Sequence, residues 1–518
     1  MTSETIDIDN QTEPEAHGGI GNPTEPEAHG GIEFAPAQTR FIVLSLLVLL
    51  VIRIFGMFTF PFIDTTEARY AEIARLMVET NDWITPQFNY GVPFWGKPPL
   101  HTWLSAGGME IFGVTQFGAR SLIFATALVL LVLFYFWVKK AAGKATALLS
   151  LAVLSSCVWF YASAAFVMTD MAMTLGTSLS MIAFWNVVTR AEKSPIWGHL
   201  VFVGLAIGLM AKGPVAVVIV GIALFLWCLG GNRWRVLALF PWLTGMLLLV
   251  VLVLPWYLAA EYKTPGFLHY FIIGEHYERF VVPGWKGDLY GSGHARPKGM
   301  IWAYWLMAFL PWSLILIGPL MRPKTLLGAL RKDQTGLRSY LFFWTIAPMI
   351  LFTPAANILP AYVLPGLPAA AFLVVLLWND AFGDVWKKSY HRIFSAGIWA
   401  TIIIFFIYLG LAIIIPDKIR LKTQKGVVDY MKNDVKVPTV YYLGNRVYSA
   451  EFYSAGKVVF LPTLDDVKKL TENTVQDAIA ISPASQAAFE AAYGTQFTYV
   501  KTSGRYRVYL ENKPGGAN

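Results

Sequence analysis

The chain has 518 residues, of which 56% are hydrophobic and only 14% are charged, and its mean hydropathy is +0.51. Soluble domains carry roughly a quarter charged residues, so this composition excludes an ordinary soluble globular protein. The formal net charge of +8 comes mostly from Lys and Arg in short segments between apolar runs, where membrane orientation explains it better than nucleic-acid binding does.

The N-terminal segment, residues 1–39, is polar and repetitive. The sequence TEPEAHGGI occurs at Thr12–Ile20 and again at Thr24–Ile32. Such a composition buries too little apolar surface to fold, so we predict a disordered cytoplasmic tail. No cleavable signal peptide is evident, because the first apolar run begins near Phe41 and carries no small-residue cleavage site.

Residues 40–415 contain repeated apolar runs of about 20 residues, the length that crosses a bilayer. We predict a polytopic α-helical membrane domain with about 11–13 spans. Hydropathy places them near 41–60, 118–138, 145–165, 170–189, 197–211, 213–230, 236–260, 301–320, 339–353, 359–378 and 394–415. With a cytoplasmic N-terminus, Lys and Arg gather in the inner loops, as the positive-inside rule requires.

This topology leaves three sizeable segments on the outer face: 61–117, 261–300 and 416–518. In the first, EARYAEIARLM predicts an amphipathic helix at the membrane interface. In the third, VPTVYYLGNRVYSAEFYSAGKVVFL indicates strands with a Gly-Asn turn, and LDDVKKLTENT indicates a helix. We therefore predict a small α/β domain outside the membrane at 416–518.

Acidic and basic residues from several segments fall on this same outer side, and ionisable residues at the membrane edge usually mark function. Asp64, Glu67, Arg69 and Lys97 lie in the first outer segment, and His276 and Arg279 lie in the second. Asp170 and Lys212 lie at the outer ends of predicted spans. Lys and Arg donate charge-assisted hydrogen bonds to phosphate, and a carboxylate accepts a proton from a hydroxyl. No Gly-rich phosphate loop is evident, so the pattern favours a lipid-linked phosphate substrate over a soluble nucleotide.

Most of these residues also have a structural interpretation. The structural interpretations are helix capping by Asp64 with Thr65 or Thr66, a snorkelling Lys97, an ion pair between Asp170 and Lys212, an interfacial His276, and an Arg279–Glu275 pair. The functional hypothesis rests on the predicted location of all these residues on the same, outer side of the membrane, rather than on any one of them.

Several motifs together resemble the bacterial lipid A aminoarabinose transferase-like family, which is related to the protein O-mannosyltransferases. The motifs are DTTEARYAEIARLM, FWGKPPLHTWL, TDMAMT, AKGP, GEHYERF and LPAYVLP, with a weaker similarity in YSAEFYSAG near Tyr448. The resemblance implies a type C glycosyltransferase fold in the bacterial inner membrane, with a periplasmic C-terminal domain. It also implies an undecaprenyl phosphate sugar as donor, lipid A as acceptor, and inversion at the sugar carbon.

The resemblance further assigns roles to individual residues. It implies that Asp64 is the catalytic carboxylate and that Lys97, Arg279 and Tyr362 bind the donor phosphate. The residues expected to shape the substrate cavity are Glu67, Arg69, Tyr70, Asp170, Lys212 and His276. We predict no cofactor and no nucleic-acid partner.

Three departures from the family pattern leave the sugar and the acceptor open. Relatives often carry an acid where this chain has Gly96, and two lysines where it has the segment Ala355–Tyr362. Gly274 stands where a metal ligand is possible, so no metal site is carried over, although a divalent-ion requirement stays open. The alternatives are a protein O-mannosyltransferase-like enzyme, which shares the donor, and a lipid-linked sugar transporter.

Overall fold

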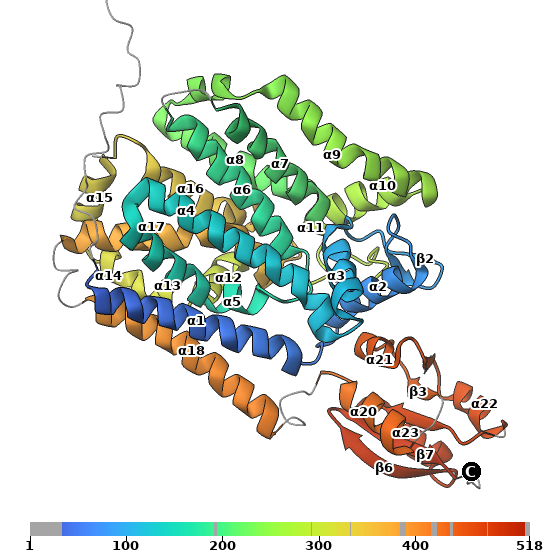
Figure 1. Ribbon diagram of the computed structural model, residues 1–518. Helices are drawn as coiled ribbons and strands as arrows, with labels where there is room; N and C mark the ends of the chain where they lie inside the picture. The colour runs from blue at the N-terminus through green and yellow to red at the C-terminus, as the bar shows by residue number, and fades with distance from the viewer. Residues whose placement is uncertain are drawn as a thin grey trace, which may run out of the picture.

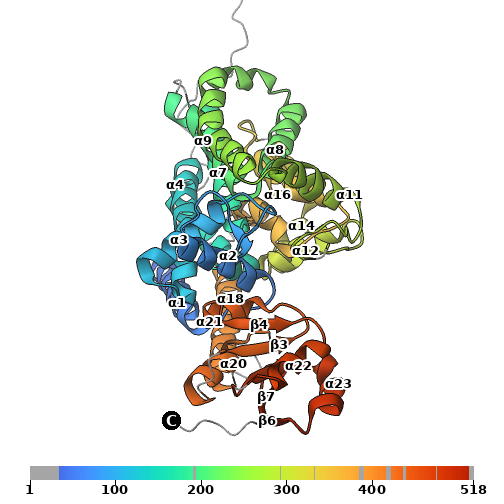
Figure 2. The same ribbon diagram turned by 90° about the vertical axis from the view of Figure 1, so that its right-hand side faces the viewer.

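The computed structural model describes residues 34–190, 194–291, 293–331, 333–383, 390–415, 422–435, 439–473 and 475–512. The described parts form a helical body (residues 34–415) and a C-terminal domain (residues 422–512) packed at one end of it (Figures 1 and 2). Residues 1–33 of the predicted disordered tail, 1–39, lie outside the described residues. The last residues of this predicted tail, from Pro36 on, belong to a helix.

The helical body is built from long helices and shorter connecting ones. The long helices are α1 (Pro36–Thr59), α4 (Gln116–Ser156), α6 (Asp170–Val188), α7 (Pro195–Lys212), α8 (Val215–Gly231), α9 (Trp242–Lys263), α16 (Leu337–Phe352), α17 (Leu367–Phe382) and α18 (Tyr390–Ile414). The shorter ones are α2 (Thr66–Thr80), α3 (Leu100–Phe112), α5 (Val158–Ser163), η1 (Trp234–Leu239), α10 (Phe267–His269), η2 (Tyr270–Glu278), α11 (Arg279–Val281), α12 (Met300–Ala308), α13 (Trp312–Ile315), α14 (Ile317–Leu320), α15 (Pro323–Arg331) and η3 (Pro360–Gly366). A small hairpin, β1 (Gln87–Asn89) with β2 (Val92–Pro93), lies between α2 and α3.

All eleven apolar segments that hydropathy favours coincide with helical structure. Within the described residues, seven helices are long and apolar enough to cross a membrane, and α12 with α13–α14 adds an eighth if this pair, bent by 98°, is one span. Helices α8 and α16 are apolar but shorter than the others. The chain is thus a multi-pass membrane protein, while the number of spans remains a prediction.

Helix α4 contains two of the predicted spans. At Ala142 and Gly143 the backbone leaves the helical region, with φ of −147° and +85°. The positive φ suits glycine, which lacks the Cβ that makes this conformation costly for other residues. Residues 116–156 are therefore two helical arms that meet near Lys139, Lys140 and Lys144, the residues predicted to form an inner loop.

Helices α6 and α7 pack closely because glycines line their contact. A Cβ on Gly176 would lie 2.6 Å from the Gly204 carbonyl oxygen, and a Cβ on Gly204 would lie 2.5 Å from the Gly176 carbonyl oxygen. Small residues let membrane helices approach in this way. The contact matters for the site described below, since Asp170 begins α6 and Lys212 ends α7.

Replacing Gly176 by alanine is expected to lower the free energy of unfolding by about 1–3 kcal/mol, because the added methyl group overpacks the α6–α7 contact. Unfolding in mixed micelles, titrated with a denaturing detergent, measures the effect. Gly221→Ala in α8 is the matched control, since its Cβ would meet nothing within 4 Å. Equal stability of the two variants would contradict the close packing.

Helix α2 forms where the sequence predicts an amphipathic helix at the membrane interface. The predicted helix is present, but most of it is buried, including the charged side chains of Glu67, Glu72 and Arg75. Glu67 accepts two hydrogen bonds from Arg120, each 2.8 Å long, and Glu72 accepts two from Arg75, each 2.7 Å long. Because these charges are paired, they can be buried where α2 packs between α3 and the C-terminal domain. The position of α2 at the membrane surface stays a prediction.

The C-terminal domain contains a five-stranded mixed sheet with helices on both faces. Its elements are α20 (Lys425–Tyr430), η5 (Met431–Val435), β3 (Val440–Leu443), α21 (Tyr448–Ser454), β4 (Val458–Leu461), η6 (Asp465–Val467), α22 (Lys468–Thr471), β5 (Ala478–Ile481), α23 (Pro483–Tyr493), β6 (Phe497–Ser503) and β7 (Tyr506–Glu511). The strand order is β4-β3-β5-β7-β6, parallel across β4, β3 and β5 and antiparallel beyond them. Residues of α20 and α21 cover one face, and residues of α22 and α23 cover the other.

The prediction of strands joined by a Gly-Asn turn is wrong for the middle of its segment. Strands β3 and β4 occupy the two ends, but YSAEFYS forms helix α21 and the two strands are parallel. Parallel neighbours require a crossover rather than a hairpin turn. The tyrosines favour a strand locally, but Ala450 packs on the sheet while Tyr448 and Phe452 pack beside α2, so packing on both sides favours the helix.

Candidate active site

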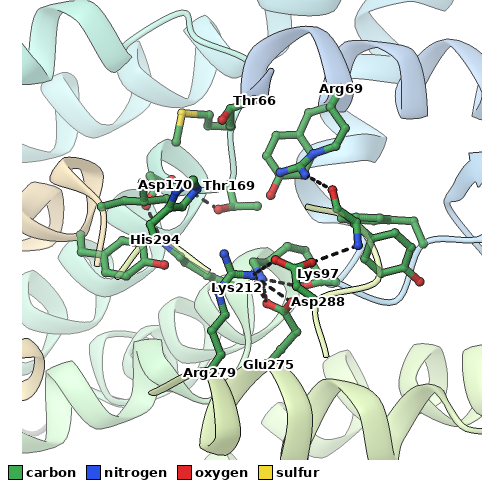
Figure 3. Close-up of a pocket in the computed structure, with 17 residues that line it drawn as sticks. Thr66, Arg69, Lys97, Thr169, Asp170, Lys212, Glu275, Arg279, Asp288 and His294 are labelled. Atoms are coloured by element: carbon green, nitrogen blue, oxygen red, sulfur yellow. Dashed lines mark hydrogen bonds and ion pairs between the residues drawn. The ribbon is translucent and has the colours of Figure 1, made fainter. Parts of the chain in front are cut away.

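A cavity lies where the segments around α2 and α3 meet the ends of α6 and α7 (Figure 3). The lining residues are Thr66, Arg69, Tyr70, Phe94, Gly96, Lys97, Met168, Thr169, Asp170, Lys212, Glu275, Arg279, Asp288, Tyr290, His294, Leu359 and Tyr362. The cavity therefore gathers side chains from segments that are far apart in the sequence.

One wall of the cavity is a cluster of two cations and two carboxylates. The Lys97 ammonium lies 2.5 Å from Glu275, and the Arg279 guanidinium lies 3.0 Å from Glu275 and 3.2 Å from Asp288. Figure 3 shows Glu275 and Arg279 pointing into the cavity from the same segment. Burial acts to raise the pKa of Glu275, but the charges and hydrogen bonds of Lys97 and Arg279 hold it below its ordinary value. Glu275 thus stays ionised and keeps both cations in place.

A second ion pair joins the ends of α6 and α7. Lys212 donates a hydrogen bond to Asp170, and both side chains are buried. The Lys212 ammonium also lies 4.2 Å from the centre of the Tyr362 ring, a cation–π contact. The predicted structural pairing of Asp170 with Lys212 is therefore present, and the pair faces the cavity at the same time.

Arg69 differs from the other cations of the cavity. Among the residues that the structure describes, Lys97, Lys212 and Arg279 each have a carboxylate partner and Arg69 has none. Its guanidinium donates to the Tyr290 carbonyl oxygen, while its Nε is buried without a hydrogen-bond partner. Arg69 consequently has donors left for a polar or anionic ligand.

His294 is a half-buried imidazole on the cavity wall that the sequence did not single out. Burial lowers its pKa, and the nearby guanidinium groups of Arg279, Arg69 and Arg296 lower it further. The ring is therefore neutral at physiological pH, so it adds hydrogen-bonding capacity to the cavity but no charge.

Seven of the ten predicted site residues line the cavity. They are Arg69, Tyr70, Lys97, Asp170, Lys212, Arg279 and Tyr362. The other three, Asp64, Glu67 and His276, lie nearby but outside it. Glu67 is held by Arg120 behind α2. His276 hydrogen-bonds the Phe271 carbonyl oxygen at 2.7 Å, and its ring would lie 3.0 Å from a Cβ on Gly213, so it packs against the end of α7.

Asp64 lies in the segment between α1 and α2 and faces the C-terminal domain. One carboxylate oxygen accepts a hydrogen bond from the Ser449 backbone N–H at 2.9 Å, and the other accepts one from the Ser449 hydroxyl. Asp64 therefore does not cap α2, the structural interpretation of its sequence position. Burial raises its pKa to about 6, although the Ser449 hydrogen bonds counteract this effect.

Several residues that line the cavity were not predicted as site residues from the sequence. The additional lining residues with polar side chains are Thr66, Thr169, Glu275, Asp288, Tyr290 and His294. Glu275 was predicted only as the ion-pair partner of Arg279, and this pair is present at 3.0 Å. Within the described part of the chain, no three His, Cys, Asp or Glu side chains are grouped as metal ligands.

Comparison with known proteins supports the resemblance from two directions. Residues 38–271 match the family described as dolichyl-phosphate-mannose-protein mannosyltransferase. A protein of Enterobacter sp. named undecaprenyl phosphate-alpha-4-amino-4-deoxy-L-arabinose arabinosyl transferase is 31% identical over 317 residues, which is 60% of this chain and 54% of the relative. A protein of the same name from Aeromonas hydrophila is 30% identical over 65% of this chain and 59% of its own length. This chain thus matches little more than half the length of these relatives.

The fold is also similar to solved structures. The crystal structure of ArnT from Cupriavidus metallidurans bound to undecaprenyl phosphate superposes with a TM-score of 0.72 at 18% identity, over 93% of this chain and all of that one. The archaeal oligosaccharyltransferase AglB from Archaeoglobus fulgidus gives a TM-score of 0.50 at 12% identity, over 92% of this chain and 74% of that one.

These similarities confirm the predicted fold class: the chain has the type C glycosyltransferase fold, with a helical membrane body and a small C-terminal α/β domain. The sequence relatives are more specific than the fold. They confirm the resemblance to the aminoarabinose transferase-like family.

Proposed function

We propose that this chain is a glycosyltransferase of the bacterial inner membrane that moves a sugar from undecaprenyl phosphate to lipid A. The observation that carries the proposal is the buried cluster of Lys97, Arg279 and Glu275 on the wall of a cavity at one end of the membrane helices. The names of the sequence relatives support the donor and the reaction class. The fold similarity to an ArnT bound to undecaprenyl phosphate supports them further.

In this proposal the donor phosphate binds Lys97, Arg279 and Tyr362. A phosphate that enters the cavity competes with Glu275 for the two cations, which can turn part of their hydrogen bonding to its oxygens. When the sugar leaves, negative charge grows on the phosphate, and the same cations stabilise it. The attack comes from the side opposite the phosphate, so the sugar carbon is inverted.

The acceptor approaches from the side of Asp64, Arg69 and Tyr70. A carboxylate with a pKa of about 6 is ionised at neutral pH and still basic enough to accept a proton from a hydroxyl. If the acceptor is a lipid A phosphate, it is already an anion, and Asp64 then orients it rather than deprotonating it. Asp170 and Lys212 form the cavity wall between the two substrates.

The proposal includes an orientation in the membrane. The N-terminus lies in the cytoplasm, and the cavity with the C-terminal domain lies in the periplasm, where lipid-linked sugars and lipid A meet. The lysines between the two arms of α4 support this orientation, because Lys and Arg are enriched in cytoplasmic loops.

Mass spectrometry of lipid A, from cells with and without the protein, tests the function. The expected result is a mass increase of one sugar that requires the protein and falls at least a hundredfold in Asp64→Asn, since the variant carboxamide is not a base. Asp465→Asn, at an exposed position of the C-terminal domain, is the matched control and should retain activity. An unmodified lipid A in cells carrying the wild-type protein would contradict the acceptor assignment.

The family match over residues 38–271 favours one alternative, a protein O-mannosyltransferase-like enzyme that uses the same kind of donor. Glycopeptide analysis of the same cells separates the two functions, because this alternative requires hexose on Ser or Thr and unchanged lipid A. A lipid-linked sugar transporter, the third hypothesis from the sequence, would modify neither.

A further inference from the structure

Asp64 and Ser449 join the helical body to the C-terminal domain. Ser449 is fully buried at the start of α21, and it donates to both carboxylate oxygens of Asp64, one bond from its backbone N–H and one from its hydroxyl. The Asp64 N–H in turn donates to the Lys422 carbonyl oxygen at 2.8 Å. The position of this carboxylate is therefore set by the C-terminal domain rather than by α1 or α2.

The surrounding contacts make this junction rigid. The Tyr453 hydroxyl accepts a hydrogen bond from the Phe62 N–H at 2.8 Å and donates one to Gln116 at 2.9 Å. Arg446 donates to the Phe88 carbonyl oxygen at 2.9 Å. These bonds fix α21 against the segments around α2, so Ser449 meets Asp64 in a defined geometry.

The junction lies next to the cavity. Thr66 and Arg69 line the cavity and follow shortly after Asp64 in the sequence, at the start of α2. Tyr448, the neighbour of Ser449, lies close enough to Arg69 for the guanidinium to lower the pKa of its hydroxyl, although burial raises that pKa overall. The start of α21 and the carboxylate it holds are thus close to two residues that line the cavity, Thr66 and Arg69.

We infer that Ser449 is a positioning residue for Asp64, so that the C-terminal domain completes the transferase site. This inference rests on the proposed function, in which Asp64 acts on the acceptor. A base is commonly oriented by a third group that hydrogen-bonds it, and Ser449 has this relation to Asp64. Each carboxylate oxygen can accept two hydrogen bonds. The two bonds from Ser449 therefore leave one lone pair on each oxygen for the hydroxyl group of the substrate that receives the sugar.

Ser449 also affects the proton affinity of Asp64. Burial raises the pKa of Asp64 to about 6, the bonds from Ser449 act against this rise, and the nearby charge of Glu451 adds to it. The other titratable groups that face Asp64 are the hydroxyls of Tyr442 and Tyr506, whose pKa values burial raises. They stay neutral at physiological pH, so Ser449 is the group whose removal changes Asp64 most.

The sign of the pH effect follows from these groups. Asp64 is active in its ionised form, so activity is present above its pKa and is lost as the pH falls through it. Removing the Ser449 hydroxyl removes a bond to the ionised form, which raises the pKa. The acid limb of the activity profile should therefore move to higher pH by about one unit, the size expected for one charge-assisted hydrogen bond.

The test measures lipid A modification by isolated membranes over a range of pH, together with the binding of undecaprenyl phosphate to the purified full-length protein. For Ser449→Ala we expect at least a tenfold lower rate, the upward pH shift, and an undecaprenyl phosphate affinity within twofold of the wild type. Ser449→Thr keeps the hydroxyl and should restore both rate and pH profile. Ser454→Ala, on the same helix but bonded to the Glu451 carbonyl oxygen, should behave as wild type.

Each contrary outcome has a distinct meaning. If Asp64→Asn is inactive while Ser449→Ala keeps the wild-type rate and pH profile, the inference is wrong and the proposed function stands. If the wild-type protein modifies no lipid A, the proposed function fails and the inference fails with it. If Ser449→Ala does not fold, Ser449→Cys carries the test, because a thiol is a weaker donor; an unchanged pH profile in that variant would overturn the inference.

Discussion

Replacing Arg279 by alanine is expected to lower the affinity for undecaprenyl phosphate by about 30–100-fold. Loss of one hydrogen-bonded charge at a buried site costs about 2–3 kcal/mol, and tenfold in affinity corresponds to about 1.4 kcal/mol. The substitution removes a phosphate donor and also leaves Asp288 without its 3.2 Å ion pair. Lys97 and Glu275 remain paired at 2.5 Å, so the cavity wall is weakened rather than lost.

Binding of undecaprenyl phosphate to the purified protein, measured at constant ionic strength, checks this expectation. Lys286→Ala is the matched control, because Lys286 is an exposed cation of the same loop region and does not line the cavity. Its affinity should stay within twofold of the wild type. Equal losses in both variants would indicate a general electrostatic attraction to the lipid, and no loss in Arg279→Ala would place the phosphate elsewhere.

The membrane helices were predictable because their signal is local. An apolar run of sufficient length has few alternatives to a helix in a membrane, since backbone polar groups must bond within the segment. The break at Ala142 and Gly143 lies between two such runs and among lysines, so it was also predictable. Helix α21 was not, because its tyrosines favour a strand and its helical form depends on packing against both the sheet and α2.

The site was predictable only as a set of residues on one side of the membrane. Lys97 and Glu275 are 178 residues apart, and no local pattern shows that they are within 2.5 Å. The same limit applies to Asp64 and Ser449, which are 385 residues apart. Charge type and the predicted side of the membrane indicated which side chains are candidates for binding a phosphate. The partner of each charge, in contrast, depends on how distant helices pack.

Glu67 shows how a charge that resembles a site residue serves the structure instead. Its side chain is 1% exposed, and Arg120, 5% exposed, donates two hydrogen bonds of 2.8 Å to it. Arg120 also donates to the carbonyl oxygens of Met57 and Phe60, at 3.3 and 2.6 Å. The pair therefore joins the end of α1, the start of α2 and the start of α4.

Arg120→Leu is expected to lower the free energy of unfolding by about 3–5 kcal/mol, because it leaves the Glu67 carboxylate buried without a counter-charge. Detergent-induced unfolding in mixed micelles measures the loss. The double variant Glu67→Leu/Arg120→Leu should lose less than Arg120→Leu alone, since it buries no unpaired charge. Lys468→Leu, which removes an exposed pair 3.7 Å long, is the control and should change little. A double variant at least as unstable as Arg120→Leu would show that the side chains act through packing rather than through their charges.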